Sequence, residues 1–583
     1  MTDLSKIKSP ADIKKMTVDE LGELCGDLRK ALLTKLAAHG GHVGPNLGFL
    51  EATVALHYVF DAPKDKLVFD VSHQTYVHKM LTGRIEAFTD PAHYDDVTGF
   101  TCPRESEYDL FEIGHTSTGV SLATGLAKAR DLAGGTENVV AVVGDGSLSG
   151  GEAFEGLDFG STLGSNFIVV VNDNDMSIAE NHGGIYDNLA LLRKTDGKAD
   201  CNLFRAMGYD YVYVPYGNDI ASLVRAFEGV RGSRRPVVVH LNTQKGKGYA
   251  PAEADRETFH YGAPFDLATG ASLHVSEAPD YSDIFASEMM RHIKSDANVA
   301  VITAGTPGVL GFGPQLRAEA GDRFVDVGIA EQDAVALASG MARGGARPVF
   351  GVVSSFLQRA YDQLSQDVAI NGTAPVVNIF YGTVAGMTDV THLGWFDIAL
   401  VSNIPGWVYL APTCVEEYRA MLDWAVHQKD YPVAVRVPGV SVVSRPGDYA
   451  VDYGRELNRA EVVHRGSGVA IIAAGATFAT ALKAAEILRS RGIDATLVNP
   501  RYLSGLDTAL LEDLRGDHSL VITAEDGCLD GGFGEKVARY YGAYGGMRVR
   551  CAGVAKQFLD RYDIPAVLAA SHLTADTLAD LAQ

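Results

Sequence analysis

The chain has no excess of basic residues, no cysteine motif and no long apolar run, and each absence excludes a class of protein. Its 583 residues include 50 Lys and Arg against 73 Asp and Glu, a formal net charge of -23, which argues against binding to nucleic acid or to an anionic membrane. The six cysteines are scattered and never spaced as CxxC, which argues against a disulfide framework and fits a reducing cytoplasm. No run of 18 apolar residues occurs, and the N-terminus lacks the apolar core expected of a signal peptide.

What is present is the composition of a globular protein with alternating strand and helix patterns. Hydrophobic residues make up 46% and charged residues 21%, a balance that can bury large cores and excludes general disorder. Short β-branched runs precede glycine-rich turns and then helical patterns, as in VVAVVGDGSLSGGEAFEGL. This alternation predicts an α/β fold with mostly parallel, doubly wound sheets, in which ligands bind at the carboxyl ends of strands.

The length predicts about three domains, because a domain usually spans about 100–200 residues. The strand and helix patterns restart twice along the chain, near Tyr281 and near Asn458. We therefore predict domains at residues 1–275, 281–445 and 457–583.

Two strand ends carry polar residues suited to a metal and a phosphate group. Gly144, Asp145 and Gly146 directly follow the strand VVAVV, and Asn174 follows the strand FIVVV 29 positions after Asp145. Oxygen ligands on two neighbouring strand ends can hold one hard cation such as Mg²⁺ or Ca²⁺, and glycine lets the backbone approach a diphosphate closely. Two coincidental turns are the alternative, because Asp-Gly is common in turns. The pairing at this spacing favours a metal-diphosphate site.

This pairing is typical of thiamine diphosphate enzymes, and the chain resembles the 1-deoxy-D-xylulose-5-phosphate synthase family within the wider transketolase group. Segments that carry the resemblance are GGHVGPNLGFLEATVALHYVF, FDVSHQTYVHKMLTGR, GHTSTG, GDGSLSGGEAFE, NDNDMSIAEN, KGKGYAPAE, DVGIAEQDAV, SSFLQRAYDQ and THLGWFD. The resemblance implies three doubly wound domains of the transketolase type: one binding diphosphate, one binding the pyrimidine and a C-terminal one. It also implies thiamine diphosphate and Mg²⁺ as cofactors.

The resemblance assigns site residues to matching positions. Asp145, Asn174 and the backbone carbonyl of Met176 are implied to bind the metal, and His115 and Lys245 to lie near the diphosphate. The other residues implied to contact the cofactor are Gly144, Gly146, Ser147, His73, Glu331, Phe356 and Arg359.

Glu331 opens a predicted helix in DVGIAEQ. The resemblance implies contact between its carboxyl group and N1′ of the aminopyrimidine. A carboxyl group there stabilises the imino tautomer, whose 4′ nitrogen removes the C2 proton of the thiazolium ring. The plainer alternative is a carboxylate favoured by the helix dipole. Phe356 is implied to stack on the aminopyrimidine; without the resemblance it would be interpreted as a core aromatic.

Four histidines fall on motifs of the family: His42, His73, His260 and His392. An isolated histidine is more often a structural residue. Carboligation, however, needs proton transfers to hydroxyl and carbonyl oxygens, which imidazole performs near pH 7. We therefore predict that these four are catalytic.

The departures from the family pattern concentrate in the predicted second domain. Tyr381 and Gly439 stand where the family carries arginines that are expected to bind the phosphate of the aldehyde acceptor. Losing two charge-assisted contacts would cost about 3–6 kcal/mol. Arginines that could substitute are Arg104, Arg359, Arg436 and Arg501. Further departures are Val353, Asp333 and Thr388, with Asp389 displaced by one position from the family's aspartate.

The resemblance implies a homodimeric, cytoplasmic transferase that decarboxylates pyruvate or a similar 2-keto acid and joins the two-carbon unit to an aldehyde, as in isoprenoid biosynthesis. One alternative is transketolase-type transfer of a ketol unit from a ketose to a non-phosphorylated or atypical aldehyde. A non-catalytic, cofactor-binding paralogue is the alternative from another class. The donor, the acceptor and the number of subunits that form the site stay open at this stage.

Overall fold

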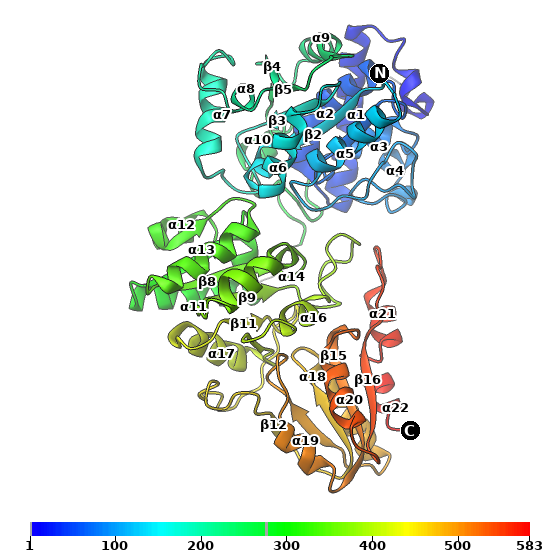
Figure 1. The fold of residues 1–583 in the computed structure, drawn as a ribbon. Helices are drawn as coiled ribbons and strands as arrows, with labels where there is room; N and C mark the ends of the chain where they lie inside the picture. Colours follow the sequence, from blue (N-terminus) through cyan, green and yellow to red (C-terminus); the bar gives the residue numbers. More distant parts are fainter. Residues whose placement is uncertain (1–2, 275–277) are drawn as a thin grey trace. The chain divides into compact units, whose positions relative to one another are not determined.

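The computed structural model describes residues 3–274 and 278–583 (Figure 1). By their internal contacts these residues form two compact units. The first is built from the N-terminal part of the chain together with Val327–Ala330, and the second from Ala278–Asp326 and Glu331–Gln583. The described strands form three sheets. The predicted boundary at residue 275 lies outside the described residues, and the division into three domains stays a prediction.

The first unit is organised around one parallel sheet in the order β1-β2-β3-β5-β4. Its strands are β1 (Lys66–Phe69), β2 (Val139–Gly144), β3 (Ile168–Asp173), β4 (Asp210–Val214) and β5 (Val237–Asn242). Alternate residues of β2 enter different cores, because Val140 and Val142 pack on one face while Val139 and Val143 pack on the other. A parallel sheet covered on both faces explains why its central strands β2, β3 and β5 each contain a continuous run of apolar, mostly β-branched residues.

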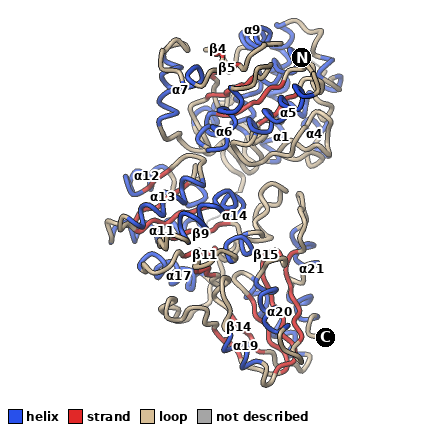
Figure 2. The backbone as a smooth tube through the Cα atoms, viewed as in Figure 1, coloured by secondary structure: helices blue, strands red, loops and turns tan. Residues whose placement is uncertain are grey.

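Helices cover both faces of this sheet (Figure 2). The core on one face includes residues of α1 (Val18–His39), α2 (Val43–Val59), α3 (Tyr76–Leu81), α4 (Glu86–Thr89), α9 (Ile220–Val230) and α10 (Ala250–Ala254). The core on the other face includes residues of α5 (Gly119–Leu132), α6 (Gly151–Ser161), α7 (Gly184–Lys194) and α8 (Leu203–Ala206). This double covering is the doubly wound arrangement expected from the sequence.

The second unit begins with a six-stranded parallel sheet in the order β10-β11-β9-β8-β6-β7. Its strands are β6 (Val299–Thr303), β7 (Phe324–Asp326), β8 (Arg347–Val353), β9 (Val376–Phe380), β10 (Val408–Leu410) and β11 (Val433–Arg436). The helices around it are α11 (Tyr281–Ser295), α12 (Pro314–Ala320), α13 (Glu331–Arg343), α14 (Ser354–Leu357), α15 (Tyr361–Gln363), α16 (Asp397–Ser402) and α17 (Val415–His427).

The same unit contains the third sheet, in the order β12-β14-β13-β15-β16, whose edge strand β12 is antiparallel to β14. Its strands are β12 (Glu461–His464), β13 (Gly468–Ala473), β14 (Thr496–Asn499), β15 (His518–Cys528) and β16 (Arg548–Val554). The helices are α18 (Thr477–Ser490), α19 (Thr508–Leu514), α20 (Phe533–Gly542), α21 (Ile564–Ala570) and α22 (Ala575–Asp580). The α/β class with mostly parallel sheets is therefore confirmed.

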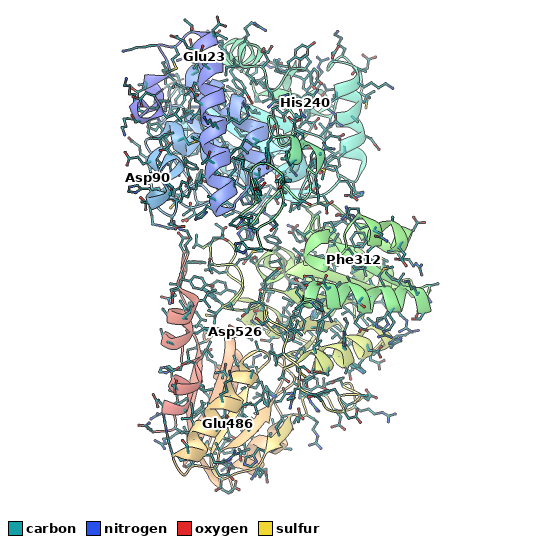
Figure 3. All side chains as sticks on the ribbon, turned by 180° about the vertical axis from the view of Figure 1, so that it is seen from behind. Glu23, Asp90, His240, Phe312, Glu486 and Asp526 are labelled. Carbon is teal, nitrogen blue, oxygen red and sulfur yellow. The ribbon has the colours of Figure 1, made fainter. Side chains whose placement is uncertain are left out.

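Polar side chains lie inside both units as well as at their surfaces (Figure 3). His240 is buried in the first unit and Asp526 in the second. Among the described residues, no helix combines the length and the apolar character needed to span a bilayer.

Candidate active site

The two polar strand ends predicted from the sequence are neighbours in the first unit. Strands β2 and β3 pair in parallel, with Gly144 opposite Asn172. Asp145 starts a short 3₁₀ turn directly after β2, and Asn174 follows the end of β3. Because both strands end at the same edge of the sheet, the carboxylate and the amide lie on neighbouring strand ends, as the metal prediction requires.

The surroundings of Asp145 fit a bound cation. Its Oδ2 atom accepts hydrogen bonds from Met176 N (3.0 Å) and Asn181 Nδ2 (2.8 Å). Burial, and then the neighbouring Asp173, raise the pKa of the Asp145 carboxyl to about 7. The buried Oδ1 atom of Asn174 has no hydrogen-bond partner among the described residues. A divalent ion would supply the missing partner and offset the buried negative charge, so these residues fit Mg²⁺.

A close backbone approach beside Asp145 fits a diphosphate. A Cβ atom added to Gly146 would lie within 3.0 Å of Ser177, so only glycine fits there without a shift. The Ser177 hydroxyl is buried and has no hydrogen-bond partner among the described residues. Lys245, which follows β5, donates from Nζ to the Ser177 carbonyl oxygen at 2.5 Å. Burial lowers the pKa of this ammonium group to about 7, and an incoming phosphate would restore its charge.

Three of the predicted catalytic histidines form one cluster in this unit. The ring centroids of His42 and His73 are 5.0 Å apart, those of His73 and His260 are 5.3 Å apart, and those of His42 and His260 are 5.8 Å apart. Two backbone hydrogen bonds between Gly41 and Gly262 fasten the segment before His42 to the segment after His260. Residues more than 200 positions apart in the chain thus meet at one place.

Asn46, which the sequence analysis did not single out, connects two of these histidines. Its Nδ2 atom donates to the carbonyl oxygens of His42 (2.8 Å) and His73 (2.7 Å), and its Oδ1 atom accepts from Tyr76 N (2.9 Å). Asn46 is fully buried. It lies in the matched segment GGHVGPNLGF, but nothing local in that segment distinguishes a positioning amide from an ordinary helix residue.

Two of the clustered imidazoles, those of His73 and His260, are neutral at physiological pH. Burial, and then the charge of Lys245, lower the pKa of His73 to about 3 and that of His260 well below its usual value. The Nδ1 atoms of both rings are buried and lack hydrogen-bond partners among the described residues. Neutral rings with unsatisfied nitrogens can accept or donate protons to a substrate.

The segment that carries His115 is tied to the strand-end turn. Ser117, two residues later, donates from Oγ to the Ser147 carbonyl oxygen at 2.9 Å. Asp70, at the end of β1, accepts from the backbone N–H groups of Ser117 (2.9 Å) and Gly119 (2.8 Å). Asp70 is a second positioning residue that the sequence analysis missed, because it lies about 50 positions from the segment that it holds.

A further buried network supports the end of β3. Asp173 accepts from three nitrogens: Arg193 Nη1 at 2.6 Å, His240 Nε2 at 2.8 Å and the backbone N–H of Asp175 at 3.1 Å. Arg193 also binds Asp175, whose φ of +57° is unusual for a residue with a side chain. This network holds the backbone that flanks Asn174, and it was also not predicted.

Glu331 is the first residue of α13 in the second unit, directly after β7 and the segment Val327–Ala330. It is buried, and its Oε2 atom has no hydrogen-bond partner among the described residues. Arg359 Nη1 lies 3.6 Å from that oxygen. Burial raises the pKa of the carboxyl group, while Arg359 opposes the shift. The geometry suits a carboxyl group that shares a proton with a ligand nitrogen.

Phe356 and His392 lie together in the same unit. Their rings meet edge to face with centroids 5.4 Å apart. The Nδ1 atom of His392 is hydrogen-bonded to Asp389 Oδ1 at 2.8 Å. Although burial acts to raise it, this contact holds the pKa of the Asp389 carboxyl below its usual value. The aspartate that is displaced by one position in the sequence therefore still pairs with the histidine.

The positions that lack the family's arginines contain no cation. Tyr381 follows β9 with a φ of +55°, and its side chain packs against the core of the second unit. Gly439 has no side chain and a φ of +81°. Arg436 does not compensate, because it is buried and binds Asp397 through Nε (2.7 Å) and Nη2 (3.2 Å).

The other two candidate arginines are also engaged. Arg104 forms an ion pair with Glu112 in the first unit, and Arg501 lies 3.5 Å from Glu417 in the second. Arg359 is also engaged, because its Nη1 atom lies 3.6 Å from Glu331 Oε2.

The predicted site residues thus fall into two groups, one in each unit. The first unit holds His42, His73, His115, Gly144, Asp145, Gly146, Ser147, Asn174, Met176, Lys245 and His260. The second holds Glu331, Phe356, Arg359 and His392. Their catalytic and binding roles stay predictions.

Family models match three stretches of the chain. The model described as 1-deoxy-D-xylulose-5-phosphate synthase matches residues 4–200, the transketolase pyrimidine binding domain matches residues 277–441, and the transketolase C-terminal domain matches residues 458–578.

Curated relatives match over nearly the whole chain. A 1-deoxy-D-xylulose-5-phosphate synthase from Symbiobacterium thermophilum is 40% identical over 96% of this chain and 91% of its own. 1-deoxy-D-xylulose-5-phosphate synthase 1 from Geobacter sulfurreducens is 38% identical over 96% of this chain and 93% of its own. Among solved structures, a transketolase from Pichia stipitis aligns over 96% of both chains with 15% identity and a TM-score of 0.44, a similarity on which nothing below depends.

Proposed function

Because the chain belongs to the 1-deoxy-D-xylulose-5-phosphate synthase family, we propose that it is a thiamine-diphosphate-dependent transferase. It decarboxylates pyruvate or a similar 2-keto acid and joins the two-carbon unit to an aldehyde. The observation that carries the proposal is the pair of strand ends in the first unit. There the Asp145 carboxylate is buried and the Asn174 side-chain oxygen has no hydrogen-bond partner among the described residues, so both are suited to bind a cation. Oxygen donors at this spacing suit Mg²⁺, which would neutralise a diphosphate in an otherwise acidic protein.

Thiamine diphosphate, when bound, would supply a nucleophilic carbon for the keto group and a sink for the electron pair that remains when CO₂ leaves. Asp145, Asn174 and the Met176 carbonyl would hold its metal. Lys245 and the backbone beside Gly146 would face its phosphates, and Phe356 would stack on its pyrimidine.

Glu331 would hold the proton that activates the cofactor. Its carboxyl group is buried, and Arg359 lies 3.6 Å away. Burial raises the pKa of this carboxyl group and favours the protonated form, while the arginine opposes that shift. We assign Glu331 to N1′ of the pyrimidine on this basis and on the family resemblance.

The histidines would move protons at the substrate. His73 and His260 offer neutral nitrogens beside His42 in one cluster, which suits proton transfer to a carboxylate, a carbonyl or a hydroxyl group. His392, whose Nδ1 atom is oriented by Asp389 at 2.8 Å, would exchange a proton with the substrate through Nε2.

The test is an incubation of the protein with thiamine diphosphate, Mg²⁺, pyruvate and a panel of aldehydes, with CO₂ measured and products identified by mass spectrometry. We expect CO₂ release and a ketose two carbons longer than the aldehyde. Transfer from a ketose without CO₂ would instead support the transketolase-type alternative. Binding of the cofactor with no turnover of any donor would support the non-catalytic paralogue and refute the proposal.

A second experiment isolates the role of Glu331. Glu331→Gln keeps the size of the side chain, and its bound cofactor should lose hydrogen-deuterium exchange at C2 by about 10²-fold or more. The affinity for the cofactor should change much less. Exchange at the rate of the unaltered protein would remove Glu331 from this role.

We further propose that the aldehyde acceptor is not selected by a phosphate group. Tyr381 and Gly439 offer no cation, and the nearby Arg436 is committed to Asp397. A dianion would lose hydration there without matching donors. The measurement is the ratio of kcat/KM for glyceraldehyde 3-phosphate over glyceraldehyde. We expect a ratio near one, rising when arginine is installed at both positions. A ratio above about 100, roughly 2.7 kcal/mol, would mean that another group such as Arg359 binds the phosphate.

The family resemblance also supports a homodimer in the cytoplasm as part of the proposal. Light scattering coupled to size-exclusion chromatography gives the mass directly. A monomeric mass under conditions in which the protein is active would refute the dimer.

A further inference from the structure

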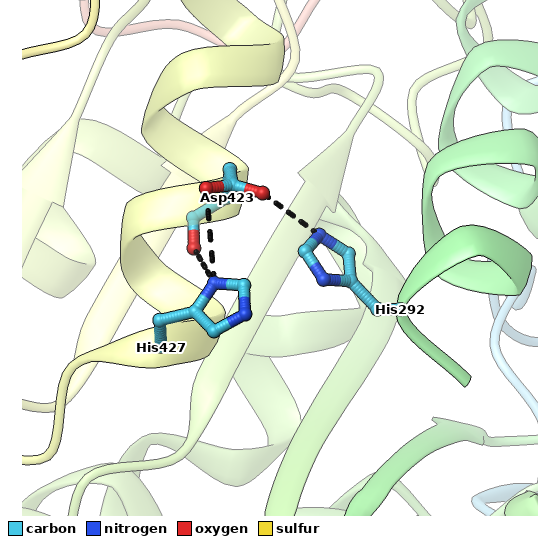
Figure 4. Close-up of side chains that lie close together, drawn as sticks. All are labelled: His292, Asp423 and His427. Carbon is cyan, nitrogen blue, oxygen red and sulfur yellow. Dashed lines mark hydrogen bonds and ion pairs between the residues drawn. The ribbon is translucent and has the colours of Figure 1, made fainter. Parts of the chain in front are cut away.

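A cluster of two histidines and one aspartate lies in the second unit, apart from the residues assigned above (Figure 4). His292 comes from α11, and Asp423 and His427 come from the last turns of α17. His292 Nε2 lies 3.6 Å from Asp423 Oδ1, and His427 Nδ1 lies 3.7 Å from Asp423 Oδ2. One ligand atom from each residue falls within 4.8 Å of the other two.

These separations are close to those of a zinc site. Ligand atoms about 2.0–2.2 Å from a tetrahedral ion lie about 3.3–3.6 Å from one another. Two imidazoles and one carboxylate are donors that zinc accepts well and that Mg²⁺ rarely uses. Small side-chain rotations would shorten the distances between the ligand atoms, now at most 4.8 Å, to these values.

The position of the cluster favours a cation independently of its ligands. α11 ends at Ser295 and α17 ends at His427, so both helices present their C-terminal turns to the cluster. Helix C-termini carry partial negative charge, which stabilises cations by about 0.3–1 kcal/mol each. Both helices also pack into the same hydrophobic core, which fixes their separation.

The Arg291 guanidinium group occupies part of the space between His292 and Asp423. Arg291 Nη2 donates to Asp423 Oδ1 at 2.8 Å and to His292 Nε2 at 3.1 Å. A guanidinium can only donate, so His292 must present the lone pair of Nε2 to it. The lone pair of His292 Nε2 is therefore directed toward the Arg291 guanidinium, and a metal ion in the place of that group would meet the same lone pair.

Displacing Arg291 is feasible because it has another partner and access to water. Its side chain is 52% exposed, and its Nε atom already binds Glu288 Oε2 at 2.9 Å. His427 needs only a change of tautomer. Its Nδ1–H group now donates to the Asp423 carbonyl oxygen at 2.7 Å, and moving the proton to Nε2 would free Nδ1 as a ligand.

We propose that His292, Asp423 and His427 bind a zinc ion that joins α11 to α17. Asp423 and His427 are about half exposed, so a water molecule completes the coordination. The ion occupies the place of the Arg291 guanidinium and stabilises the two helices against separation. This site is independent of the proposed Mg²⁺ site, whose ligands are all oxygen atoms in the other unit.

The experiment uses the full chain without a histidine tag, saturated with Mg²⁺ and thiamine diphosphate. Zinc is titrated in competition with a chromophoric chelator, and Co²⁺ is titrated separately to record its visible d–d bands. We expect one tight Zn²⁺ equivalent, intense cobalt bands between about 500 and 650 nm that are typical of four-coordinate N/O sites, and a higher melting temperature with zinc.

Three variants and one control define the site. His427→Ala and Asp423→Asn change half-exposed residues, and each should weaken zinc binding at least tenfold. Arg291→Ala removes the competing cation and should strengthen binding. His464→Ala is the matched control, because His464 is an exposed histidine paired with one aspartate, Asp494, at 2.8 Å. It should leave zinc binding unchanged.

The outcomes separate cleanly. Absence of a tight zinc equivalent in both the unaltered protein and Arg291→Ala would overturn the proposal. So would equal binding by His427→Ala and the unaltered protein, because the ion would then lie elsewhere. A zinc equivalent that is lost only when Mg²⁺ is raised would place the ion in the Mg²⁺ site and would also overturn it.

Discussion

Two buried polar clusters, one in each unit, differ in how completely their atoms are paired. The strand-end cluster of the first unit (Asp145, Asn174 and Ser177) contains a buried carbonyl oxygen and a buried hydroxyl group without partners among the described residues. The arginine cluster of the second unit (Asp397, Tyr409 and Arg436) has none in the same set. Asp145 is as buried as the three residues of the arginine cluster, whereas Asn174 and Ser177 are partly buried residues whose unpartnered atoms are buried. Burial of a carboxylate alone therefore does not distinguish a binding site from a structural network.

The arginine cluster shows what full pairing looks like. Arg436 binds Asp397 through two nitrogens and donates from Nη2 to the Asp526 carbonyl oxygen at 2.6 Å. The Tyr409 hydroxyl donates to Asp397 as well. No buried polar atom of these three residues lacks a hydrogen-bond partner in the described part of the chain. The difference indicates that buried polar atoms without hydrogen-bond partners, rather than buried charges, mark the ligand-binding site among these two clusters.

The largest effect that we expect comes from Asp145→Ala. Mg²⁺-dependent binding of thiamine diphosphate should weaken on the order of 10³-fold, about 4 kcal/mol, and turnover should fall to background. The melting temperature of the cofactor-free protein should not fall, because an unneutralised buried carboxylate costs stability. Titration calorimetry and a thermal melt measure the two quantities.

Asp158→Ala is the control for this experiment, since Asp158 is an exposed acid on the nearby helix α6. It should change neither quantity. If Asp145→Ala lowered the melting temperature strongly while cofactor affinity persisted, the strand-end cluster would be structural and the comparison between the two clusters would fail.

The opposite pattern is expected for Asp397→Ala. Removing one partner of a buried pair leaves the Arg436 charge uncompensated, which costs about 3–5 kcal/mol of unfolding free energy. The affinity of the remaining folded protein for the cofactor should stay within a few-fold. Denaturant unfolding and calorimetry test both. The double variant Asp397→Leu, Arg436→Met should recover much of the loss, and a failure to recover would show that more than charge pairing holds these segments.

Much of the fold could be predicted from the sequence because local patterns determine it. β-branched runs followed by glycine gave β2 and β3 with their polar ends. The apolar stretch around Lys483 has the same pattern of a β-branched run, a glycine and a helical segment, and it forms β13 and α18. Continuous apolar strands indicated sheets buried on both faces, as the structure shows.

The supporting residues of the candidate site could not be predicted. Asn46 and Asp70 act through backbone atoms about 27–49 positions away, and such contacts depend on tertiary packing. The sequence also suggested that Arg436 could bind a phosphate, whereas its burial against Asp397 depends on how β11 meets α16. Asp389 is displaced by one position from the family's aspartate, and the turn before His392 brings the two side chains together.

Asn46→Ala is expected to have an intermediate effect. Two carbonyl oxygens and one N–H group lose their buried partner, which costs about 1–3 kcal/mol. Because the carbonyls belong to His42 and His73, we expect kcat to fall about tenfold while cofactor affinity is unchanged. Asn499→Ala is the matched control, since Asn499 is equally buried and binds Glu417 and Arg501 in the second unit. Equal kinetic losses in both variants would mean that Asn46 contributes stability only.

The smallest effect concerns pH and the His73 ring. Its pKa is about 3 in the folded protein and about 6.5 in an unfolded chain. Above pH 6.5 neither the folded nor the unfolded protein binds a proton at this ring, so the ring does not change the free energy of unfolding. As the pH falls from 6.5 toward 3, only the unfolded chain binds the proton, and the free energy of unfolding decreases. At pH 5 this loss is about 2 kcal/mol for one ring. Between pH 7 and pH 5, the free energy of unfolding of His73→Asn should therefore decrease by about 2 kcal/mol less than that of the unaltered protein, as measured by denaturant unfolding.

His464→Asn is the control, because it removes an exposed ring. Its free energy of unfolding should change with pH as that of the unaltered protein does. The arginine cluster contains no histidine, so a similar relief on replacing Asp397 would show that the acid sensitivity does not come from the imidazole cluster.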